Sequence, residues 1–192
     1  MNVILASRSK FRRQALELLN IDYEVKPSEI DEKSLGHSNP KVLARKLAEA
    51  KAEDVGRQLA GKSLVIGGDL FVLFRGNIYE KPETEKEATE MLQTFSGKGV
   101  KIISGVSVFN TETNESESEL GQAEIVFRDI SEKEIERYVS NYPVLDLAGG
   151  FEKEGVLKFS REVHGDLSFL TGLPLNKLIQ MLKRNDLDPL LR

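Results

Sequence analysis

The sequence of 192 residues contains no cysteine and only two histidines. Without cysteine the chain forms no disulfide, holds no zinc through thiolates and has no cysteine nucleophile. Two histidines, His37 and His164, are too few for a His-rich metal cluster. No apolar run approaches the roughly 18 residues of a membrane-spanning helix, so we expect no membrane association.

A strong excess of charge of one sign is also absent. The 27 Lys and Arg residues against 31 Asp and Glu residues give a formal net charge of −4. A general nucleic-acid-binding surface needs a broad positive excess, so we expect no nucleic acid polymer as a partner. The length predicts one domain over residues 1–192, or two small lobes that share a core. The first ten residues place their apolar stretch before their charges, the reverse of a signal peptide, so we expect a cytoplasmic protein.

Hydrophobic patterns predict strands mixed with helices. Strands are predicted over 3–6, 64–74, 102–109 and 123–128, and helices after 7–10, 39–40, 84–87, 131–134 and 172–175. An Asn-Pro pair and two capping-box sequences mark three of these helix starts. The polar and acidic residues 110–122 predict a long exposed hairpin tip. Because one connection is a hairpin, we expect a mixed sheet and not a purely parallel one.

The strongest local signal lies between the first predicted strand and the first predicted helix. Four of the six residues from 8 to 13 are basic: Arg8, Lys10, Arg12 and Arg13. A helix N-terminus is itself electropositive, so this crowding is unfavourable unless an anion binds there. Hydroxyls of Ser7 or Ser9 would add donors, and the pattern predicts a polyphosphate site. The alternative is a solvated basic helix end.

Asp69 lies inside a long apolar strand, so we expect its carboxylate to be largely buried. Such burial is costly unless a cation, a metal or a set of donors compensates the charge. The two glycines before Asp69 allow another group to approach the backbone closely. A buried carboxylate suits a general base or a magnesium ligand. A structural Asp paired with a nearby Lys or Arg is the alternative.

Lys51 interrupts an apolar stripe at every fourth position of the helix predicted after residue 40. Its ammonium must reach an anion or extend to water, and extension to water is the commoner outcome for an isolated lysine. Taken alone, Lys81 and the pair Asp31-Glu32 are typical of surface charges. The sequence therefore offers several charged candidates whose roles depend on what lies near them.

The order and spacing of several short motifs are highly specific. In chain order they are Leu5-Ala6-Ser7-x-Ser9-x-x-Arg12-Arg13, Asp31-Glu32, Leu47-Ala48-x-x-Lys51-Ala52, Gly68-Asp69, Lys81-Pro82, Met91-Leu92, Ser96-Gly97, Gly105-Val106, Asp146-x-Ala148-Gly149, Gly155 and Gly172-Leu173-Pro174-Leu175. Together, along nearly the whole chain, they resemble the Maf family of nucleoside triphosphate pyrophosphatases.

The resemblance implies an α/β fold of the Maf/ITPase type: an elongated mixed sheet with flanking helices, and two lobes around a central cleft. It implies hydrolysis of a nucleoside triphosphate to the monophosphate and pyrophosphate with Mg²⁺ or Mn²⁺, and a homodimer. The family pattern implies a general base or metal-site acid at Asp69 and a metal-side carboxylate at Glu32. It implies phosphate contacts at Ser7, Arg12, Arg13, Lys51 and Lys81, the two lysines counting among the catalytic residues.

Three further positions concern the nucleobase. Phe11, Leu70 and Glu154 stand where the common family pattern has Arg, Thr and Gln. An aromatic residue at the first position and Glu at the third resemble the subfamily that prefers 7-methyl-GTP, although that subfamily has Trp at the first position and Gln at the second. An aromatic face can stack on cationic 7-methylguanine, and Glu154 can accept its N1–H and 2-amino hydrogens.

The sequence therefore predicts a nucleoside triphosphate pyrophosphatase with 7-methyl-GTP as its substrate. A UTP- or dTTP-type pyrophosphatase of the same family is one alternative. A nucleotide-binding regulator of cell division with little turnover is a second, and a phosphohydrolase that releases orthophosphate is a third. The identity of the product separates the enzymatic alternatives.

Overall fold

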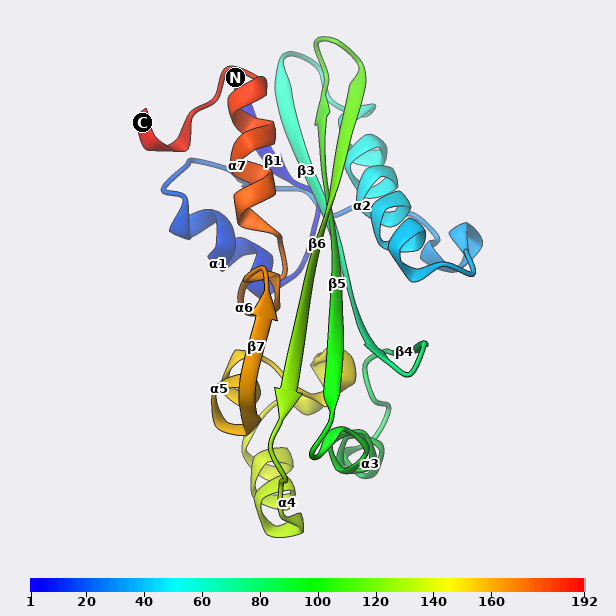
Figure 1. Cartoon of the computed structure of the whole chain (residues 1–192). Coiled ribbons are helices and arrows are strands. Elements are labelled where there is room, and N and C mark those ends of the chain that lie inside the picture. Colours follow the sequence, from blue (N-terminus) through cyan, green and yellow to red (C-terminus); the bar gives the residue numbers. More distant parts are fainter. Residues whose placement is uncertain (192) are drawn as a thin grey trace. The chain divides into compact units, whose positions relative to one another are not determined.

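The computed structural model describes residues 1–191, and for Phe169 the backbone alone. Its strands are β1 (Asn2–Leu5), β2 (Glu24–Val25), β3 (Ser63–Phe74), β4 (Asn77–Tyr79), β5 (Gly99–Asn110), β6 (Glu115–Phe127) and β7 (Ser160–Gly165) (Figure 1). Its α-helices are α1 (Lys10–Leu18), α2 (Pro40–Gly56), α3 (Glu85–Phe95), α4 (Glu132–Asn141), α5 (Lys153–Phe159), α6 (Ser168–Thr171) and α7 (Leu175–Arg184). Short 3-10 helices are η1 (Glu32–Leu35), η2 (Val144–Asp146), η3 (Ala148–Gly150) and η4 (Pro189–Leu191).

The strands form a seven-stranded mixed sheet in the order β2-β1-β3-β5-β6-β7, and β4 pairs with β3. Strand β1 is parallel to β2 and β3, whereas β4 and β7 are antiparallel to β3 and β6. The predicted mixed α/β fold is therefore confirmed. Among the described residues no helix is both long and apolar enough to cross a membrane.

The chain divides into two compact units, as the expected two lobes require. Unit 1 comprises Met1–Leu70, Ile103–Gly121 and Asp166–Arg192, and unit 2 comprises Phe71–Ile102 and Gln122–Gly165. Strands β3, β5 and β6 contribute residues to both units. Each unit therefore consists of segments that are distant in the sequence.

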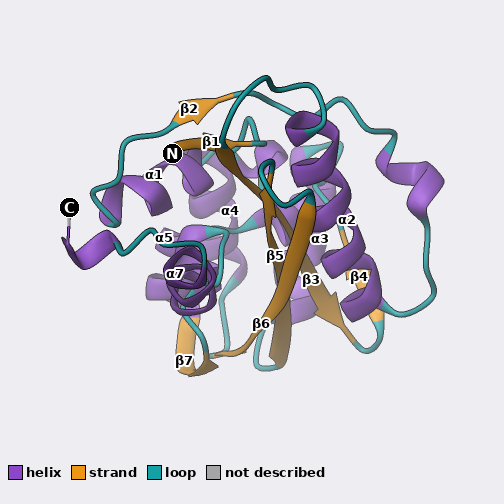
Figure 2. Cartoon of the chain, turned by 90° about the horizontal axis from the view of Figure 1, so that it is seen from above, coloured by secondary structure: helices purple, strands orange, loops and turns teal. Residues whose placement is uncertain are grey.

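In unit 1, helices cover both faces of the strands. One buried cluster combines β1, β3, α1 and α7, and includes Leu5, Leu16 and Leu182. A second cluster lies on the opposite face, where Ile4 and Val65 pack with residues of α2 such as Val55. Figure 2 shows α2 on one side of β3 and α7 on the other. A strand that is covered on both faces carries apolar side chains on both, which explains the continuous apolar runs in the sequence.

Local capping sequences set the helix starts of unit 1. Ser9 caps α1, where its Oγ accepts a hydrogen bond from the backbone N–H of Arg12 at 3.4 Å. Asn39 caps α2 through a 2.9 Å bond from the N–H of Lys41, and Pro40 occupies the first turn. These contacts satisfy N–H groups that have no partner within the helix. The predicted starts of both helices are confirmed.

Unit 2 has an aromatic core. Phe95 contacts the rings of Phe74, Tyr79, Phe127 and Phe151, with ring centroids 4.9–6.2 Å apart. The capping sequences predicted for α3 and α4 are both present at the observed helix starts. These rings and helix caps hold together the unit that carries α3, α4 and α5.

The prediction of a long exposed tip over 110–122 is wrong. Strands β5 and β6 are joined by the short turn 111–114, and β6 begins at Glu115. The strand is polar for a tertiary reason: Ser116 donates a 2.8 Å hydrogen bond to Oε1 of Glu53 on α2. A local pattern cannot distinguish hydroxyl groups that are bonded to a helix from hydroxyl groups that face water.

Candidate functional site

Ser7 and Arg12 meet where β1 leads into α1. Ser7 is buried directly after the strand, and Arg12 lies in the first turn of the helix. The Nη1 of Arg12 donates to Ser7 Oγ at 3.0 Å, and its Nε donates to the carbonyl of Gly172 at 3.3 Å. We call these three groups the Arg12 corner. A guanidinium has five N–H donors, so these two bonds leave three for an anionic ligand.

Gly68 brings the Arg12 corner close to β3. A Cβ on Gly68 would lie 3.2 Å from Nε of Arg12 and 2.4 Å from Cδ2 of Leu173. A side chain at the residue before Asp69 would therefore displace the side chains of Leu173 and Arg12. Burial lowers the pKa of Arg12 from its ordinary value, and the charges of Asp69 and Glu32 oppose this shift. A partly desolvated guanidinium with free donors is a favourable partner for phosphate oxygens.

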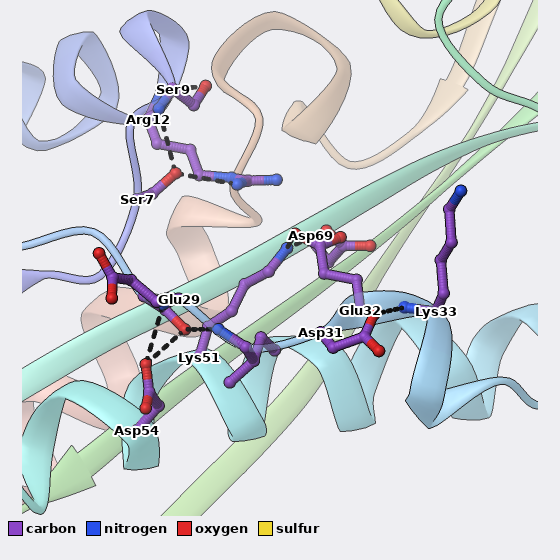
Figure 3. A network of polar contacts seen from close by, with 12 residues as sticks. Ser7, Ser9, Arg12, Glu29, Asp31, Glu32, Lys33, Lys51, Asp54 and Asp69 are labelled. Carbon is purple, nitrogen blue, oxygen red and sulfur yellow. Dashed lines mark hydrogen bonds and ion pairs between the residues drawn. The ribbon is translucent and has the colours of Figure 1, made fainter.

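Lys51 connects Asp69 with Glu32 (Figure 3). Its Nζ donates to Asp69 Oδ1 at 2.7 Å and lies 3.0 Å from Glu32 Oε1. Lys51 and Asp69 are each 7% exposed, so Asp69 is buried as predicted and Lys51 is buried with it. The Lys51 ammonium therefore contacts two carboxylates and does not extend to water. An Asp–Lys pair is also what the structural alternative for Asp69 predicts.

Close backbone packing places Lys51 beside Asp69. A Cβ on Gly67 would lie 2.0 Å from the carbonyl oxygen of Ala48, which means that α2 rests directly on β3 at this point. Lys51 lies three residues after Ala48, and Asp69 lies two residues after Gly67. The close approach expected from the paired glycines is confirmed: Gly67 admits α2, and Gly68 admits Arg12.

The remaining predicted residues of unit 1 lie near this group in the sequence. Phe11 is half-buried on α1, and Arg13 is exposed on the same helix. The Tyr23 hydroxyl donates to the backbone carbonyl of Arg13 at 3.3 Å. Leu70 is half-buried on β3, next to Asp69. The structure thus brings together Ser7, Arg12, Lys51, Asp69 and Glu32, and leaves Arg13 on the surface of α1.

Two predicted residues, Lys81 and Glu154, belong to unit 2. Lys81 is exposed in the segment between β4 and α3, after Glu80, whose carbonyl accepts a 2.9 Å hydrogen bond from the N–H of Gly149. Glu154 lies in the first turn of α5. Its Oε2 is buried and has no hydrogen-bond partner among the described residues. A buried carboxylate oxygen in this state is an acceptor for ligand N–H groups.

The acidic groups of unit 1 are suited to a divalent cation whose remaining ligands come from the substrate and water. Among residues 1–191 no group of three or more His, Asp or Glu side chains is arranged as a metal site. Mg²⁺ is commonly bound through one or two carboxylates together with substrate phosphates and water. Glu32 and Asp69 supply two carboxylates that already converge on one cation, the Lys51 ammonium. The donor set therefore fits Mg²⁺ or Mn²⁺.

One contributor to the site was not assigned a role from the sequence. Gly172 ends α6 with φ of 69°, a left-handed conformation that favours glycine, and this presents its carbonyl to Arg12. The sequence contains the Gly-Leu-Pro-Leu motif to which Gly172 belongs, but Arg12, to which its carbonyl is bonded, lies 160 residues away. The only sequence feature that could have pointed to Gly172 is a glycine in a short motif before a predicted helix.

The fold is shared with a known class of α/β proteins. The structure of the Staphylococcus aureus Ham1 protein has a TM-score of 0.51 to this chain, at 14% identity, covering 97% of this chain and 100% of that chain. A family model described as Maf-like protein matches residues 2–185, and the chain belongs to this family. A 7-methyl-GTP pyrophosphatase from Idiomarina loihiensis is 37% identical over 191 residues, which are 98% of this chain and 96% of the relative.

Proposed function

We propose that this protein is a nucleoside triphosphate pyrophosphatase that hydrolyses 7-methyl-GTP to 7-methyl-GMP and pyrophosphate. The observation that carries the proposal is the grouping of Arg12 and Lys51 with Asp69 and Glu32 in unit 1. The relative of 37% identity, named a 7-methyl-GTP pyrophosphatase, supports the same assignment. Cations that bind phosphates and carboxylates that activate water or hold a metal are the two requirements of this reaction.

The phosphate chain is assigned to the cationic side of the group. Arg12 has donors beyond its bonds to Ser7 and Gly172, and the start of α1 adds backbone N–H groups. In the proposal Arg13 and Lys81 also contact phosphate. Lys51 moves part of its hydrogen bonding from the carboxylates to the substrate, since an ammonium carries three donors.

Hydrolysis is assigned to Asp69. Its carboxylate takes a proton from a water molecule whose oxygen attacks the α-phosphorus. The bond between the α-phosphorus and the bridging oxygen to the β-phosphate breaks, and its electron pair leaves with pyrophosphate. Glu32 and Asp69 would hold a bound Mg²⁺ or Mn²⁺, which supplies charge neutralisation of the phosphates. No covalent enzyme intermediate is required, and no protein nucleophile is assigned.

Base selection is assigned to Glu154, Phe11 and Leu70. The buried, unpartnered Oε2 of Glu154 is suited to the N1–H and 2-amino groups of guanine. A carboxylate also complements the positive charge of 7-methylguanine, which Gln in the common family pattern would not. Phe11 offers a half-buried ring for stacking. Because β3, β5 and β6 contribute to both units, we propose that residues 1–192 act as one Maf-like domain.

The proposal is tested with a panel of nucleotides. Purified protein is incubated with Mg²⁺ or Mn²⁺ and GTP, 7-methyl-GTP, UTP, CTP or dTTP, and pyrophosphate and orthophosphate are measured separately. We expect pyrophosphate, fastest from 7-methyl-GTP, and loss of activity in Asp69→Asn but not in the matched change of the exposed Asp22→Asn. Full activity of Asp69→Asn contradicts the assigned mechanism, and orthophosphate as the first product contradicts the reaction.

The assignment of the base has a separate test. Glu154→Gln replaces the carboxylate by an amide that can accept fewer hydrogen bonds from guanine and carries no charge. We expect the ratio of kcat/KM for 7-methyl-GTP to that for UTP to fall by about tenfold or more. An unchanged ratio removes Glu154 from base selection and leaves the pyrophosphatase assignment intact.

A further inference from the structure

Asp54 on α2 anchors the chain segment that leads to Glu32 (Figure 3). One carboxylate oxygen, Oδ2, accepts a hydrogen bond from Ser28 Oγ at 2.8 Å and another from the backbone N–H of Glu29 at 3.0 Å. Ser28 Oγ in turn accepts from the N–H of Ile30 at 3.3 Å. Ser28 and Glu29 are therefore bonded directly to one side chain of the helix, and Ile30 is linked to it through Ser28.

The anchored residues continue directly into the turn that presents Glu32. Asp31 caps η1, its Oδ1 accepting from the N–H of Lys33 at 3.1 Å, while Ser34 Oγ donates to its carbonyl at 2.7 Å. Glu32 is the first residue of this short helix. Its side chain is 55% exposed, so packing does not fix the carboxylate. Its position depends on the backbone that carries it and on the contact with Lys51.

Helix α2 thus holds the segment at two places. Lys51 and Asp54 are three residues apart, which places them on adjacent turns of one helix face. Asp54 binds the segment at Ser28 and Glu29, and Lys51 contacts it at Glu32. The same helix also brings Lys51 to Asp69. A displacement of residues 28–30 would therefore move Glu32 relative to Asp69.

We propose that Asp54 is a positioning residue that fixes residues 28–30 and so holds the Glu32 carboxylate beside Asp69. The inference rests on the proposed function in one respect, namely that Glu32 and Asp69 together bind the divalent cation. Groups that orient a metal ligand typically change metal affinity or activity 10–100-fold when they are removed. Because the anchor is a pair of hydrogen bonds to one oxygen, an amide at this position retains it and a methyl group does not.

Four variants separate positioning from general stability. Asp54→Ala removes both anchoring bonds, and Asp54→Asn keeps an acceptor in the same place. Ser28→Ala removes one of the two bonds to Asp54 and also the acceptor of the Ile30 N–H. Because Ser28 lies in a loop, we expect this variant to fold even where Asp54→Ala does not. Gln58→Ala is the matched control, since Gln58 contacts the carbonyl and Oδ1 of Asp54 but not residues 28–30.

Three measurements are made on the full chain. Amide hydrogen exchange at Glu29 and Ile30, followed by NMR, reports the anchor itself. Electron paramagnetic resonance of free Mn²⁺ reports metal binding without turnover, and the Mn²⁺ concentration for half-maximal pyrophosphate release reports the active enzyme. We expect Asp54→Ala to exchange at Glu29 roughly tenfold faster, to bind Mn²⁺ roughly tenfold more weakly and to need roughly tenfold more Mn²⁺. Ser28→Ala shifts exchange at Glu29 and the two Mn²⁺ readouts less, while Asp54→Asn and Gln58→Ala remain within about twofold of wild type.

The outcomes distinguish this inference from the proposed function. Wild-type Mn²⁺ binding in Asp54→Ala overturns the inference. If Asp54→Ala does not fold, the same result in Ser28→Ala overturns it. A loss of Mn²⁺ binding in Asp54→Asn equal to that in Asp54→Ala overturns it as well. A wild-type protein that binds no Mn²⁺ also overturns it. A wild-type protein that binds Mn²⁺ but releases no pyrophosphate contradicts the proposed function alone, and the exchange and Mn²⁺-binding results then decide the inference.

Discussion

The buried contact between Lys51 and Asp69 makes a quantitative prediction about stability. Replacing Lys51 by Met keeps most of the length of the unbranched side chain and removes its charge. Both partners are 7% exposed and their charged atoms are 2.7 Å apart. Removing one partner of a buried ion pair costs about 3–5 kcal/mol because the other charge is left uncompensated. The second contact contributes less: Glu32 is 55% exposed, and exposed pairs contribute about 0–1 kcal/mol.

A double-mutant cycle assigns the loss to the correct partner. We expect Lys51→Met to lower the free energy of unfolding by about 3–5 kcal/mol in the wild type and by about 1 kcal/mol in the Asp69→Asn background. The coupling between these two residues is then about 2–4 kcal/mol. In the Glu32→Gln background the loss should change by less than about 1 kcal/mol. Urea denaturation followed by circular dichroism measures all of these values.

Two results would refute this reasoning. One is a Lys51→Met protein that loses less than about 1 kcal/mol, which would mean that Asp69 is compensated by other groups or by water. The other is an equal loss in the wild-type and Asp69→Asn backgrounds, which would mean that the stabilisation by Lys51 does not come from its contact with Asp69.

Two further predictions concern the packing of α2 and the pH dependence of stability. Gly67→Ala places a methyl group 2.0 Å from the Ala48 carbonyl, so we expect a loss of about 3 kcal/mol in urea denaturation, whereas Gly36→Ala, with its nearest contact at 3.6 Å, should be neutral. Hydrogen bonds from Arg128 and Ser131 hold the pKa of Glu134 at about 2 instead of 4.5. A carboxylate whose pKa is lowered in the folded protein stabilises the fold at pH values above its pKa in the unfolded chain. The urea midpoint of wild type should therefore exceed that of Glu134→Gln by the full amount at neutral pH, and the difference should disappear as the pH falls through about 2. A difference that persists below about pH 2 would contradict this.

Much of the fold was predictable because its signals are local. The apolar runs of β1 and β3 and the caps at Ser9 and Asn39 each depend on residues within one element. The edge strand β7 was missed because nearly all its residues are exposed and carry no apolar alternation. The length of β6 was missed because Ser116 is satisfied by a glutamate of α2, a contact that no local pattern reveals.

The sequence showed which charged residues of the candidate site stand in apolar surroundings, but not which of them contact one another. Lys51 on an apolar helix stripe and Asp69 inside an apolar strand each needed a partner, and the structure makes them partners of one another. Glu32 had no such signal because it is exposed, and only the family motif pointed to it. The anchoring role inferred for Asp54 depends on a contact with a loop more than 20 residues away in the sequence.

The Arg12 corner also has a consequence for the newly made chain. Arg12 and the carbonyl of Gly172 that binds it are 160 residues apart, and Leu182 of α7 belongs to the same buried cluster as Leu5. All the segments of unit 2 leave the ribosome before Asp166. Unit 2 is thus available to fold during translation, whereas unit 1 stays incomplete until synthesis has passed Leu182. Because the proposed function assigns triphosphate binding to Arg12, we expect nascent chains that end before α7 to bind no nucleotide.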